Sequence, residues 1–400
     1  MSKPKIRFKG YCNDWERRKL GEVAEFNPKS EIPDEFEYVD LESVVGTEMI
    51  SHRTEAKESA PSRAQRVAQT GDVFFQTVRP YQRNNYLFLK PDKNYVFSTG
   101  YAQMRPYIDA AFLMSFLQTD SFVKIVLDNC TGTSYPAINS HDLSNLEISL
   151  SKSLEEQKKV GEIITTLDHL ITLHQRQCEN AKKLKKFMLQ KMFPKKNQKN
   201  PEIRFVGFTN DWERRKFSEL VTIERGGSPR PIDKFITNDE NGLNWVKIGD
   251  APEQENYITQ TAEKIKPEGL SKTREVHPGD LILSNSMSFG RPYIMAIDGC
   301  IHDGWLAIRN TQKSFDLKFL CTLLGTDGML NQYKAMAAGS TVNNLNKELV
   351  GGTTVAFPIM EEQIKIGEYF SNLDHLITLH QNKCDELKKL KKFMLQNMFV

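Results

Sequence analysis

The sequence has no apolar run of membrane-spanning length. No stretch approaches the roughly 18 to 20 consecutive apolar residues that a membrane-spanning helix needs. The opening MSKPKIR lacks the apolar core of a secretory signal peptide. We therefore expect a cytoplasmic protein with no membrane partner.

Cysteine is scarce, and its spacing excludes the usual disulfide and zinc patterns. The 400 residues include 6 cysteines, and no two of them form a Cys-x-x-Cys pair, so we expect reduced and mostly buried thiols. His169, His174 and Cys178 are of residue types that can bind a metal ion. Ligands on one helix face sit three or four residues apart, whereas these two histidines are five apart and diverge by about 140°. The sequence therefore predicts no metal site.

Motifs for catalysis are also missing. The sequence has no G-x-x-x-x-G-K-[ST] loop, no G-x-S-x-G elbow and no H-E-x-x-H helix. It contains no Asn-Pro-Pro or Asp-Pro-Pro of the kind that amino-methyltransferases use to hold a flipped base, and Asn27-Pro28-Lys29 is only a turn-like fragment of one. These absences favour a binding protein over an enzyme.

What the sequence does contain is a repeat. The phrase NDWERRK stands at positions 13–19 and again at 210–216. A longer match joins residues 155–193 to 361–399, where 27 of 39 positions are identical. A chain of 400 residues exceeds what one hydrophobic core usually holds, so we expect two tandem halves, each with its own globular segment.

Between the repeated blocks the halves differ but keep common landmarks. Gly71-Asp72 and Gly279-Asp280 each precede an apolar run typical of a strand. Arg79-Pro80 corresponds to Arg291-Pro292. One mixed α/β fold that carries two different surfaces explains this pattern. We therefore expect one scaffold that recognises two different ligands.

The repeated block predicts a long helix with one narrow apolar stripe. It lacks internal proline, and its apolar positions recur every three or four residues, as in a coiled-coil seam. Antiparallel pairing of the two copies would relate the halves by a pseudo-twofold axis. The midpoints of the two copies are positions 174 and 380, so His174 and His380 should meet at the centre. The predicted seam comprises Leu167, Leu170, His174 and Cys178 with Leu373, Leu376, His380 and Cys384.

The predicted architecture is therefore mixed α+β, with two similar globular domains and two long antiparallel helices that form a coiled coil. We place the first globular domain at residues 1–153 and its helix at 154–194. The second globular domain covers 195–358, and its helix covers 359–400.

Polar loops at matching places in both halves are candidates for DNA contact. Arginine pairs with guanine in the major groove, and asparagine or glutamine pairs with adenine. Glycine–hydroxyl turns offer donors to phosphates. A solvated surface is the alternative for each loop, and also for the lysine cluster 182–186, which could hold phosphates or face a partner protein. The candidates are Gln76, Arg79, Tyr81, Gln82, Arg83, Asn84, Thr133, Ser134 and Tyr135 in the first half, and Arg225, Gly227, Ser228, Arg230, Asn285, Ser286, Ser288, Arg291, Ser340, Thr341 and Asn343 in the second.

Over essentially its whole length the chain resembles the specificity subunits of type I restriction–modification systems. The resemblance rests on the opening WERRKLGE at 15–22, the Gly-Asp strands, the tracts SLEEQK at 153–158 and PIMEEQ at 358–363, and the paired helices. In the second half RGGSP at 225–229, WVKIGD at 245–250 and IHDGW at 301–305 also resemble that family. The first half departs from it, because FSTGY at 97–101 replaces the IHDGW stretch.

This resemblance implies a non-catalytic subunit for host defence. Two target-recognition domains would each read one half of an asymmetric, bipartite sequence in double-stranded DNA, and the helices would fix the spacer. Two methyltransferase subunits would dock on the helices and methylate adenine with S-adenosylmethionine. Restriction subunits that need ATP and Mg²⁺ would join them, so this chain itself would bind no cofactor.

Two alternatives stay open from the sequence. A standalone nuclease or methyltransferase would need an active site that none of the motifs above supplies. A purely structural coiled-coil adaptor would explain the helices but not two divergent, polar-rich globular domains.

Overall fold

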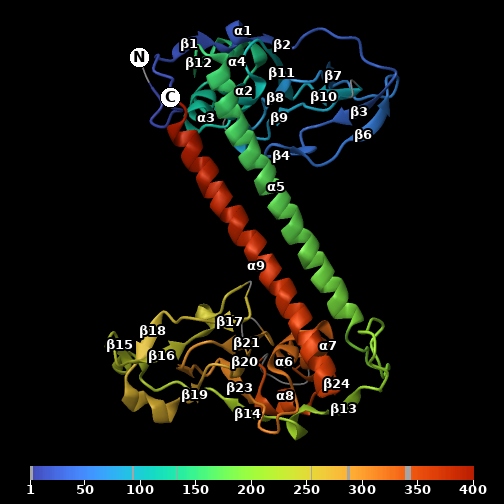
Figure 1. Ribbon diagram of the computed structural model, residues 1–400, viewed down its shortest axis with the longest axis vertical. Helices are drawn as coiled ribbons and strands as arrows, with labels where there is room; N and C mark the ends of the chain where they lie inside the picture. Colours follow the sequence, from blue (N-terminus) through green and yellow to red (C-terminus); the bar gives the residue numbers. More distant parts are fainter. Residues whose placement is uncertain (1–2, 92–93, 133, 254, 286–288, 338–343) are drawn as a thin grey trace. The chain divides into compact units, whose positions relative to one another are not determined.

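The computed structural model describes residues 3–91, 94–132, 134–253, 255–285, 289–337 and 344–400. It divides the chain into two compact units (Figure 1). Unit 1 comprises Met1–Gln175 with Asn382–Val400, and unit 2 comprises Arg176–Gln381. Two long helices, α5 (Leu154–Lys191) and α9 (Met360–Asn397), each contribute a part to both units. Both units mix helices and strands, which confirms the predicted fold class.

Unit 1 is built on two four-stranded sheets with orders β6-β3-β10-β7 and β2-β11-β8-β9. The stacked rings of Phe74 and Phe97, with centroids 3.7 Å apart, join the two sheets in the core. The strand after Gly71-Asp72 is present as predicted. The strands are β2 (Ala24–Phe26), β3 (Glu35–Val39), β6 (Arg53–Ala56), β7 (Ala64–Val67), β8 (Val73–Gln76), β9 (Tyr86–Leu87), β10 (Tyr95–Ser98) and β11 (Tyr101–Pro106), with a separate hairpin of β4 (Val44–Val45) and β5 (Glu48–Met49).

Short capped helices cover the second of these sheets. The side chain of Asp109 accepts a hydrogen bond from the backbone N–H of Phe112, and Thr119 does the same for Phe122. Each cap satisfies a backbone donor that the first turn of a helix leaves free. Thr119 is therefore the N-cap residue of its helix. The helices are α1 (Leu20–Val23), α2 (Ala110–Leu117), α3 (Asp120–Asp128) and α4 (Ser140–Asn145), with the 3₁₀ turn η1 (Pro80–Gln82).

Unit 2 repeats this plan with two five-stranded sheets, ordered β14-β23-β20-β21-β17 and β15-β18-β16-β22-β19. Tyr293 and Trp305 are almost fully buried between them, whereas Trp245 is buried in a separate cluster with Ile265 and Cys300. The strands are β14 (Thr222–Arg225), β15 (Ile236–Thr237), β16 (Leu243–Val246), β17 (Tyr257–Ile258), β18 (Glu263–Ile265), β19 (Arg274–Val276), β20 (Leu281–Ser284), β21 (Pro292–Met295), β22 (Gly299–Ile301) and β23 (Trp305–Arg309). The helices are α6 (Leu317–Leu324), α7 (Asp327–Ala337) and α8 (Lys347–Gly352), with 3₁₀ turns η2 (Phe217–Glu219), η3 (Ile232–Lys234), η4 (Ile248–Asp250) and η5 (Pro267–Lys272).

The repeated phrase NDWERRK forms the same framework element in each unit. Its last four residues are β1 (Glu16–Lys19) and β13 (Glu213–Lys216), which pair antiparallel with β12 (Glu147–Leu150) and β24 (Thr354–Phe357). Its tryptophan is buried in both units: Trp15 packs edge-on against Phe112 and Phe399, and Trp212 against Phe193 and Phe319. The phrase therefore recurs because it closes the same core twice.

Each long helix begins inside its own unit (Figure 1). A Cβ on Gly161 would lie 2.6 Å from the backbone nitrogen of Phe112, and one on Gly367 would lie 2.7 Å from that of Phe319. Only glycine allows α5 to pass this close to α2, and α9 this close to α6. The early glycine of each repeated block thus marks a helix-packing contact rather than a break.

The helices pair antiparallel within each unit. Asp168 forms an ion pair with Lys391 in unit 1, and Lys185 with Asp374 in unit 2. The contact predicted for His174 with His380 stays a prediction, because the two lie in different units.

The buried stripe also differs from the predicted seam at one position in each copy. Leu167, Cys178, Leu373 and Cys384 are buried as expected. Leu376 is 43% exposed, whereas the neighbouring Ile377 is 6% exposed and takes its place. Leu170 is half-buried beside the buried Ile171, and His174 and His380 are half-buried. The line of buried residues shifts by one position around each long helix. This is because the helix packs against a globular core at one end and against the other long helix along the rest of its length.

All six cysteines are free, and four of them are buried. Among the described residues, no single helix is long and apolar enough to cross a membrane, and only the bent pair α2–α3 passes that test jointly. In the same part of the chain, no three His, Cys, Asp or Glu side chains gather as metal ligands would.

Candidate nucleic-acid interface

In unit 1 two of the predicted loops lie side by side. The loop after β8 and the segment 131–137 are joined by a bridge between Val78 and Ala137, and the backbone N–H of Arg79 donates to the carbonyl of Pro136 at 2.8 Å. The guanidinium of Arg79 lies over the ring of Tyr135, 4.5 Å from its centroid. Tyr135 is 64% exposed, so this corner presents a cation stacked on one exposed aromatic face, and Tyr81 in the same loop is 50% exposed.

The backbone of this loop is strained at two arginines. Arg79 and Arg83, on either side of η1, have φ values of 55° and 56° in the left-handed region. A side chain there costs about 1–2 kcal/mol per residue. Non-glycine residues held in this region cluster at binding and catalytic sites, where the surrounding structure enforces the conformation. The strain therefore marks the loop 79–83 as a candidate site.

Arg83 itself is occupied within the unit. Its guanidinium donates to the carbonyl of Gln118 at 3.0 Å and to the carboxylate of Asp120 at 2.6 Å. This hydrogen bond from Arg83 lowers the pKa of Asp120. Arg83 thus ties the loop to α3, and Arg79 is the arginine of the two that is placed to meet a ligand.

Three further predicted residues support the loop instead of facing solvent freely. Gln76 is 2% exposed, and its amide donates to the carbonyl of Val78 at 2.7 Å and to the side chain of Gln82 at 3.0 Å. The side chain of Asn84 accepts from the backbone N–H of Gly46 at 2.8 Å. The sequence pattern of glutamines and asparagines did not separate such internal partners from solvent-facing ones. Ser134 is exposed, and Thr133 lies outside the described residues.

In unit 2 the turn 225–230 meets the stretch 301–304. A Cβ on Gly226 would lie 2.2 Å from the carbonyl oxygen of His302, and one on Gly227 would lie 2.6 Å from that of Lys272. Both positions therefore admit only glycine, since backbone atoms cannot move aside as a flexible side chain can. The two glycines bring the following serine and arginine against Asp303.

Asp303 is the centre of this second cluster. Its carboxylate accepts from the hydroxyl of Ser228 at 3.0 Å, and Arg230, with 82% of its side chain exposed, lies 3.6 Å away. His302 Nδ1 accepts the backbone N–H of Gly304 at 2.9 Å, so the neutral ring carries its proton on Nε2 and donates it to Asp303 at 2.9 Å. One carboxylate thereby fixes a hydroxyl, an imidazole and an arginine at one exposed edge, beside the exposed Arg225.

The remaining predicted residues of unit 2 divide between three places. Asn285 is 3% exposed and donates to the backbone carbonyl of Asp303 at 2.8 Å, so it holds the cluster from inside. Arg291 stacks on Tyr293 and donates to the carbonyl of Glu255 at 3.2 Å. It lines a separate groove beside the end of α5. Ser286, Ser288, Ser340, Thr341 and Asn343 lie outside the described residues.

Both units therefore share one structural framework but present different exposed side chains. Asp72 and Asp280 follow glycines with φ of 97° and 92°, and each is held by an arginine from a neighbouring strand, Arg105 at 2.9 Å in unit 1 and Arg309 in unit 2. On this common frame, unit 1 presents an arginine–tyrosine stack and unit 2 a carboxylate-centred cluster.

Comparison with known proteins decides the family. The model described as the type I restriction modification DNA specificity domain matches twice, over residues 13–183 and 209–389. The chain belongs to this family. The type I restriction enzyme MjaVIII specificity subunit of Methanocaldococcus jannaschii is 25% identical over 305 residues, which cover 72% of this chain and 69% of that protein. The crystal structure of the type I restriction–modification system S subunit from M. genitalium has a TM-score of 0.67 at 15% identity, covering 100% of this chain and 99% of that one, and so supports the fold.

As a type I specificity subunit, the chain is a non-catalytic, DNA-binding protein. Both exposed clusters lie inside the two matched ranges. Sequence reasoning missed two features of this specificity subunit. The hairpin β4–β5, with Val45 56% exposed and its turn at Gly46 held by Asn84, was signalled only by a glycine between valines and a threonine. Asp303 lies in the family-like IHDGW stretch, but the sequence pattern did not predict it as a site residue.

Proposed function

We propose that this specificity subunit reads an asymmetric, bipartite sequence in double-stranded DNA, with one half read by each unit. It would direct adenine methylation and ATP-dependent restriction by its partner subunits. The observation that carries the proposal is the contrast described above: the same frame supports Arg79 with Tyr135 in one unit and Ser228, Arg230 and Asp303 in the other. Two identical readers would need no such difference.

The exposed groups suit base edges and phosphates. An arginine held on an aromatic face keeps its donors in one plane, as bidentate recognition of guanine requires. A carboxylate such as that of Asp303 can accept from the amino group of cytosine. Arg225 and Arg230 are exposed next to it and are suited to phosphates, which position a protein on DNA without specifying sequence.

The proposed roles of the segments follow the boundaries that were predicted from the sequence. Residues 1–153 and 195–358 would be the target-recognition domains, and residues 154–194 and 359–400 the spacer helices. Two methyltransferase subunits with S-adenosylmethionine, and restriction subunits with ATP and Mg²⁺, would assemble on this chain in the cytoplasm. The chain would bind no cofactor of its own.

Mapping methylated adenines by single-molecule sequencing tests this proposal. Cells would express the chain with its methyltransferase subunit, before and after residues 20–150 are replaced by the corresponding segment of another specificity subunit. We expect methylation in a split motif, of which only one half changes after the replacement. Methylation that is absent, or unaffected by the replacement, would overturn the proposal.

A further inference from the structure

A turn of unit 1 occupies the same place in the fold as the turn of unit 2 that carries Asp303. The two turns follow β10 and β22, and their sequences differ, since FSTGY stands where unit 2 has IHDGW. Strand pairing aligns them nonetheless. Tyr101 lies opposite the last residue of β8, as Trp305 lies opposite the last residue of β20. Two positions before these aromatic residues stand Thr99 in unit 1 and Asp303 in unit 2.

Matched hydrogen bonds hold the two turns in the same way. The turn glycine, Gly100 or Gly304, donates its backbone N–H to the side chain two residues before it, at 3.2 Å in unit 1 and 2.9 Å in unit 2. Its carbonyl accepts the backbone N–H of the first residue after the neighbouring strand, Thr77 at 3.0 Å or Asn285 at 2.9 Å. The carbonyl of that residue in turn accepts a backbone N–H from the segment before α4 or α8, at 3.0 Å in both units. The residue in the middle of each turn therefore has the same position on the shared framework.

The turn of unit 1 adjoins the loop that carries Arg79. Thr77 is held to the carbonyl of Gly100 by two hydrogen bonds, from its backbone N–H at 3.0 Å and from its hydroxyl at 2.8 Å. Two residues further on, Arg79 stacks on Tyr135. Thr99 is half-buried, and its hydroxyl has no hydrogen-bond partner among the described residues. The turn thus extends the candidate interface of unit 1 by one side chain that is free to meet a ligand.

Two arginines beside this turn lack acidic partners within the described part of the chain. Arg63 is exposed, and its carbonyl accepts the backbone N–H of Thr99 at 2.8 Å. Arg66, on the neighbouring strand β7, is half-buried, and its Nε has no hydrogen-bond partner. Because a buried cation without a counter-ion is costly, an anion held here would stabilise it. In unit 2 the arginine at the same strand position, Arg274, has Glu224 at 3.9 Å.

We propose that Thr99 reads one A·T base pair in the half of the target that unit 1 recognises, at the place that Asp303 has in unit 2. The proposal rests on the proposed function, since it takes each unit as a reader of DNA. A threonine methyl group can contact the 5-methyl group of thymine in the major groove, whereas an aspartate accepts from the amino group of cytosine. Arg63, exposed next to it, is suited to a phosphate, which supplies the missing anion.

Position in the fold separates Thr99 from the other threonines of unit 1. Thr70 is exposed as well, but it precedes β8 and so lies at the opposite end of this strand from Thr77. Its hydroxyl donates to the carbonyl of Lys90 at 2.8 Å. Thr70 is therefore a matched control, because it has the same side chain and a surface position but stands away from the turn.

Removing two methyl groups one at a time tests the proposal. The full chain with its methyltransferase subunit would be bound to target duplexes in which each thymine of the unit 1 half is replaced in turn by deoxyuridine, which lacks the 5-methyl group. At one position the parent should lose about fourfold in affinity, the effect of exposing one buried methyl group. Thr99→Ser, which has lost its own methyl group, should lose nothing further there, whereas Thr99→Val and Thr70→Ser should respond like the parent. A unit 1 half without an A·T pair, or a response to deoxyuridine that never depends on residue 99, would overturn the proposal.

Exchanging the turn residue gives a second measurement. Thr99→Asp should change the preferred base from thymine to cytosine at one position of the unit 1 half, by about tenfold, and leave the other half unchanged. Thr70→Asp should leave both halves unchanged. A folded Thr99→Asp protein, judged by its melting temperature, that keeps the parent's bases would contradict the proposal, and if this variant does not fold, the deoxyuridine series with Thr99→Ser decides. A parent complex that methylates no split motif would overturn the proposed function itself, whereas a split motif that ignores residue 99 would overturn this inference alone.

Discussion

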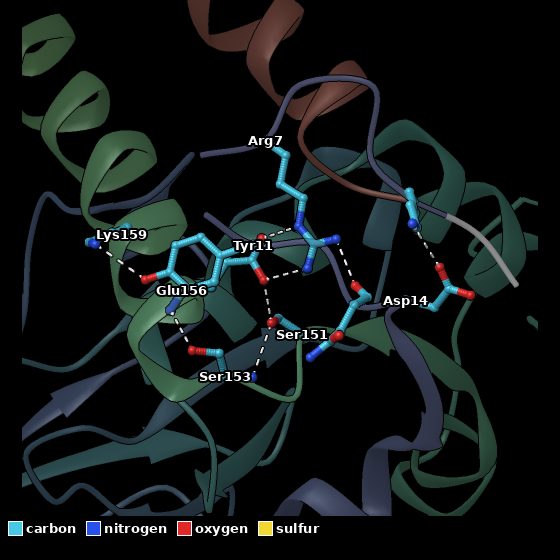
Figure 2. Close-up of polar contacts among 9 residues, drawn as sticks. Arg7, Tyr11, Asp14, Ser151, Ser153, Glu156 and Lys159 are labelled. Carbon is cyan, nitrogen blue, oxygen red and sulfur yellow. Dashed lines mark hydrogen bonds and ion pairs between the residues drawn. The ribbon is translucent and has the colours of Figure 1, made fainter. Parts of the chain in front are cut away.

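Arg7 donates two hydrogen bonds to Glu156, from Nε at 2.6 Å and from Nη2 at 2.9 Å. Figure 2 shows the carboxylate between this guanidinium and the hydroxyl of Ser151, which also donates to it. The glutamate side chain is 1% exposed and the arginine side chain 12%. The pair fastens the first turn of α5 to the segment that precedes NDWERRK. Unit 2 repeats it with Arg204 and Glu362.

Breaking this pair should loosen the start of α5. Glu156→Gln leaves the guanidinium of Arg7 buried without its carboxylate, and removing one partner of a buried ion pair costs about 3 kcal/mol or more. We expect faster amide exchange in the first turns of α5 and a lower melting temperature of unit 1. Glu155→Gln is the matched control, because Glu155 has 72% of its side chain exposed and forms a surface ion pair with Lys159. Equal effects of the two substitutions would contradict the assignment.

The same pair predicts a pH dependence of stability. Burial works against ionisation of Glu156, but the hydrogen bonds from Arg7 and Ser151 outweigh it and hold the pKa of this carboxyl below its ordinary value. A carboxyl whose pKa is lower in the folded state stabilises the fold above its unfolded pKa, near about 4.3, and loses that contribution as the pH falls through the folded pKa. Unfolding free energy should therefore fall below about pH 4.3, and less steeply in Glu156→Gln. Urea titrations at pH 3 to 6 would measure this difference.

The glycines of the turn 225–229 give a prediction about the second unit. Gly226→Ala would place a Cβ 2.2 Å from the backbone oxygen of His302, so the strand end must shift. Overpacking of this kind costs about 2 kcal/mol or more. We expect a lower melting temperature and a loss of methylation that depends on the second half of the target.

Gly249→Ala is the control for this substitution, because nothing lies within 4 Å of a Cβ at that position. It should leave both melting temperature and target unchanged. A Gly226→Ala protein that melts and methylates like the parent would show that the close approach of the two backbones is not needed.

The repeated phrases allowed much of this fold to be predicted, and the reason is physical. Trp15 and Trp212 fill the same place in two cores, so the phrase around them recurs. The length of each long helix that its own globular core covers could not be read in this way. Periodicity locates an apolar stripe, but it does not tell how many turns a globular core takes up, and the contact of Gly161 with Phe112 joins segments far apart in the sequence.

The loop residues show a second limit of sequence reasoning. Gln76 and Arg79 have equally suitable chemistry for a base edge, yet the first is buried and the second stacks on Tyr135 at the surface. Arg291 was matched to Arg79 by its proline neighbour, but it lines the groove of unit 2. Residue type indicates what a side chain could bind, whereas the turn of the backbone decides which way it points.

Arg79 and Arg230 provide the sharpest test of two separate readers. Arg79→Ala should relax one half of the target and Arg230→Ala should weaken binding through the other unit, because Arg79 stacks on the exposed Tyr135 in unit 1 and Arg230 is itself exposed in unit 2. Loss of a bidentate arginine–guanine contact costs about 1–3 kcal/mol for that base pair, whereas loss of a phosphate contact weakens binding to all sequences alike. Arg79→Lys should behave like Arg79→Ala, because lysine reproduces neither the stack on Tyr135 nor the fork of donors. Arg291→Ala should leave the recognised bases unchanged. Binding of duplexes altered in one half at a time, at several salt concentrations, would separate these effects, and a uniform loss for Arg79→Ala would reassign it to the phosphates.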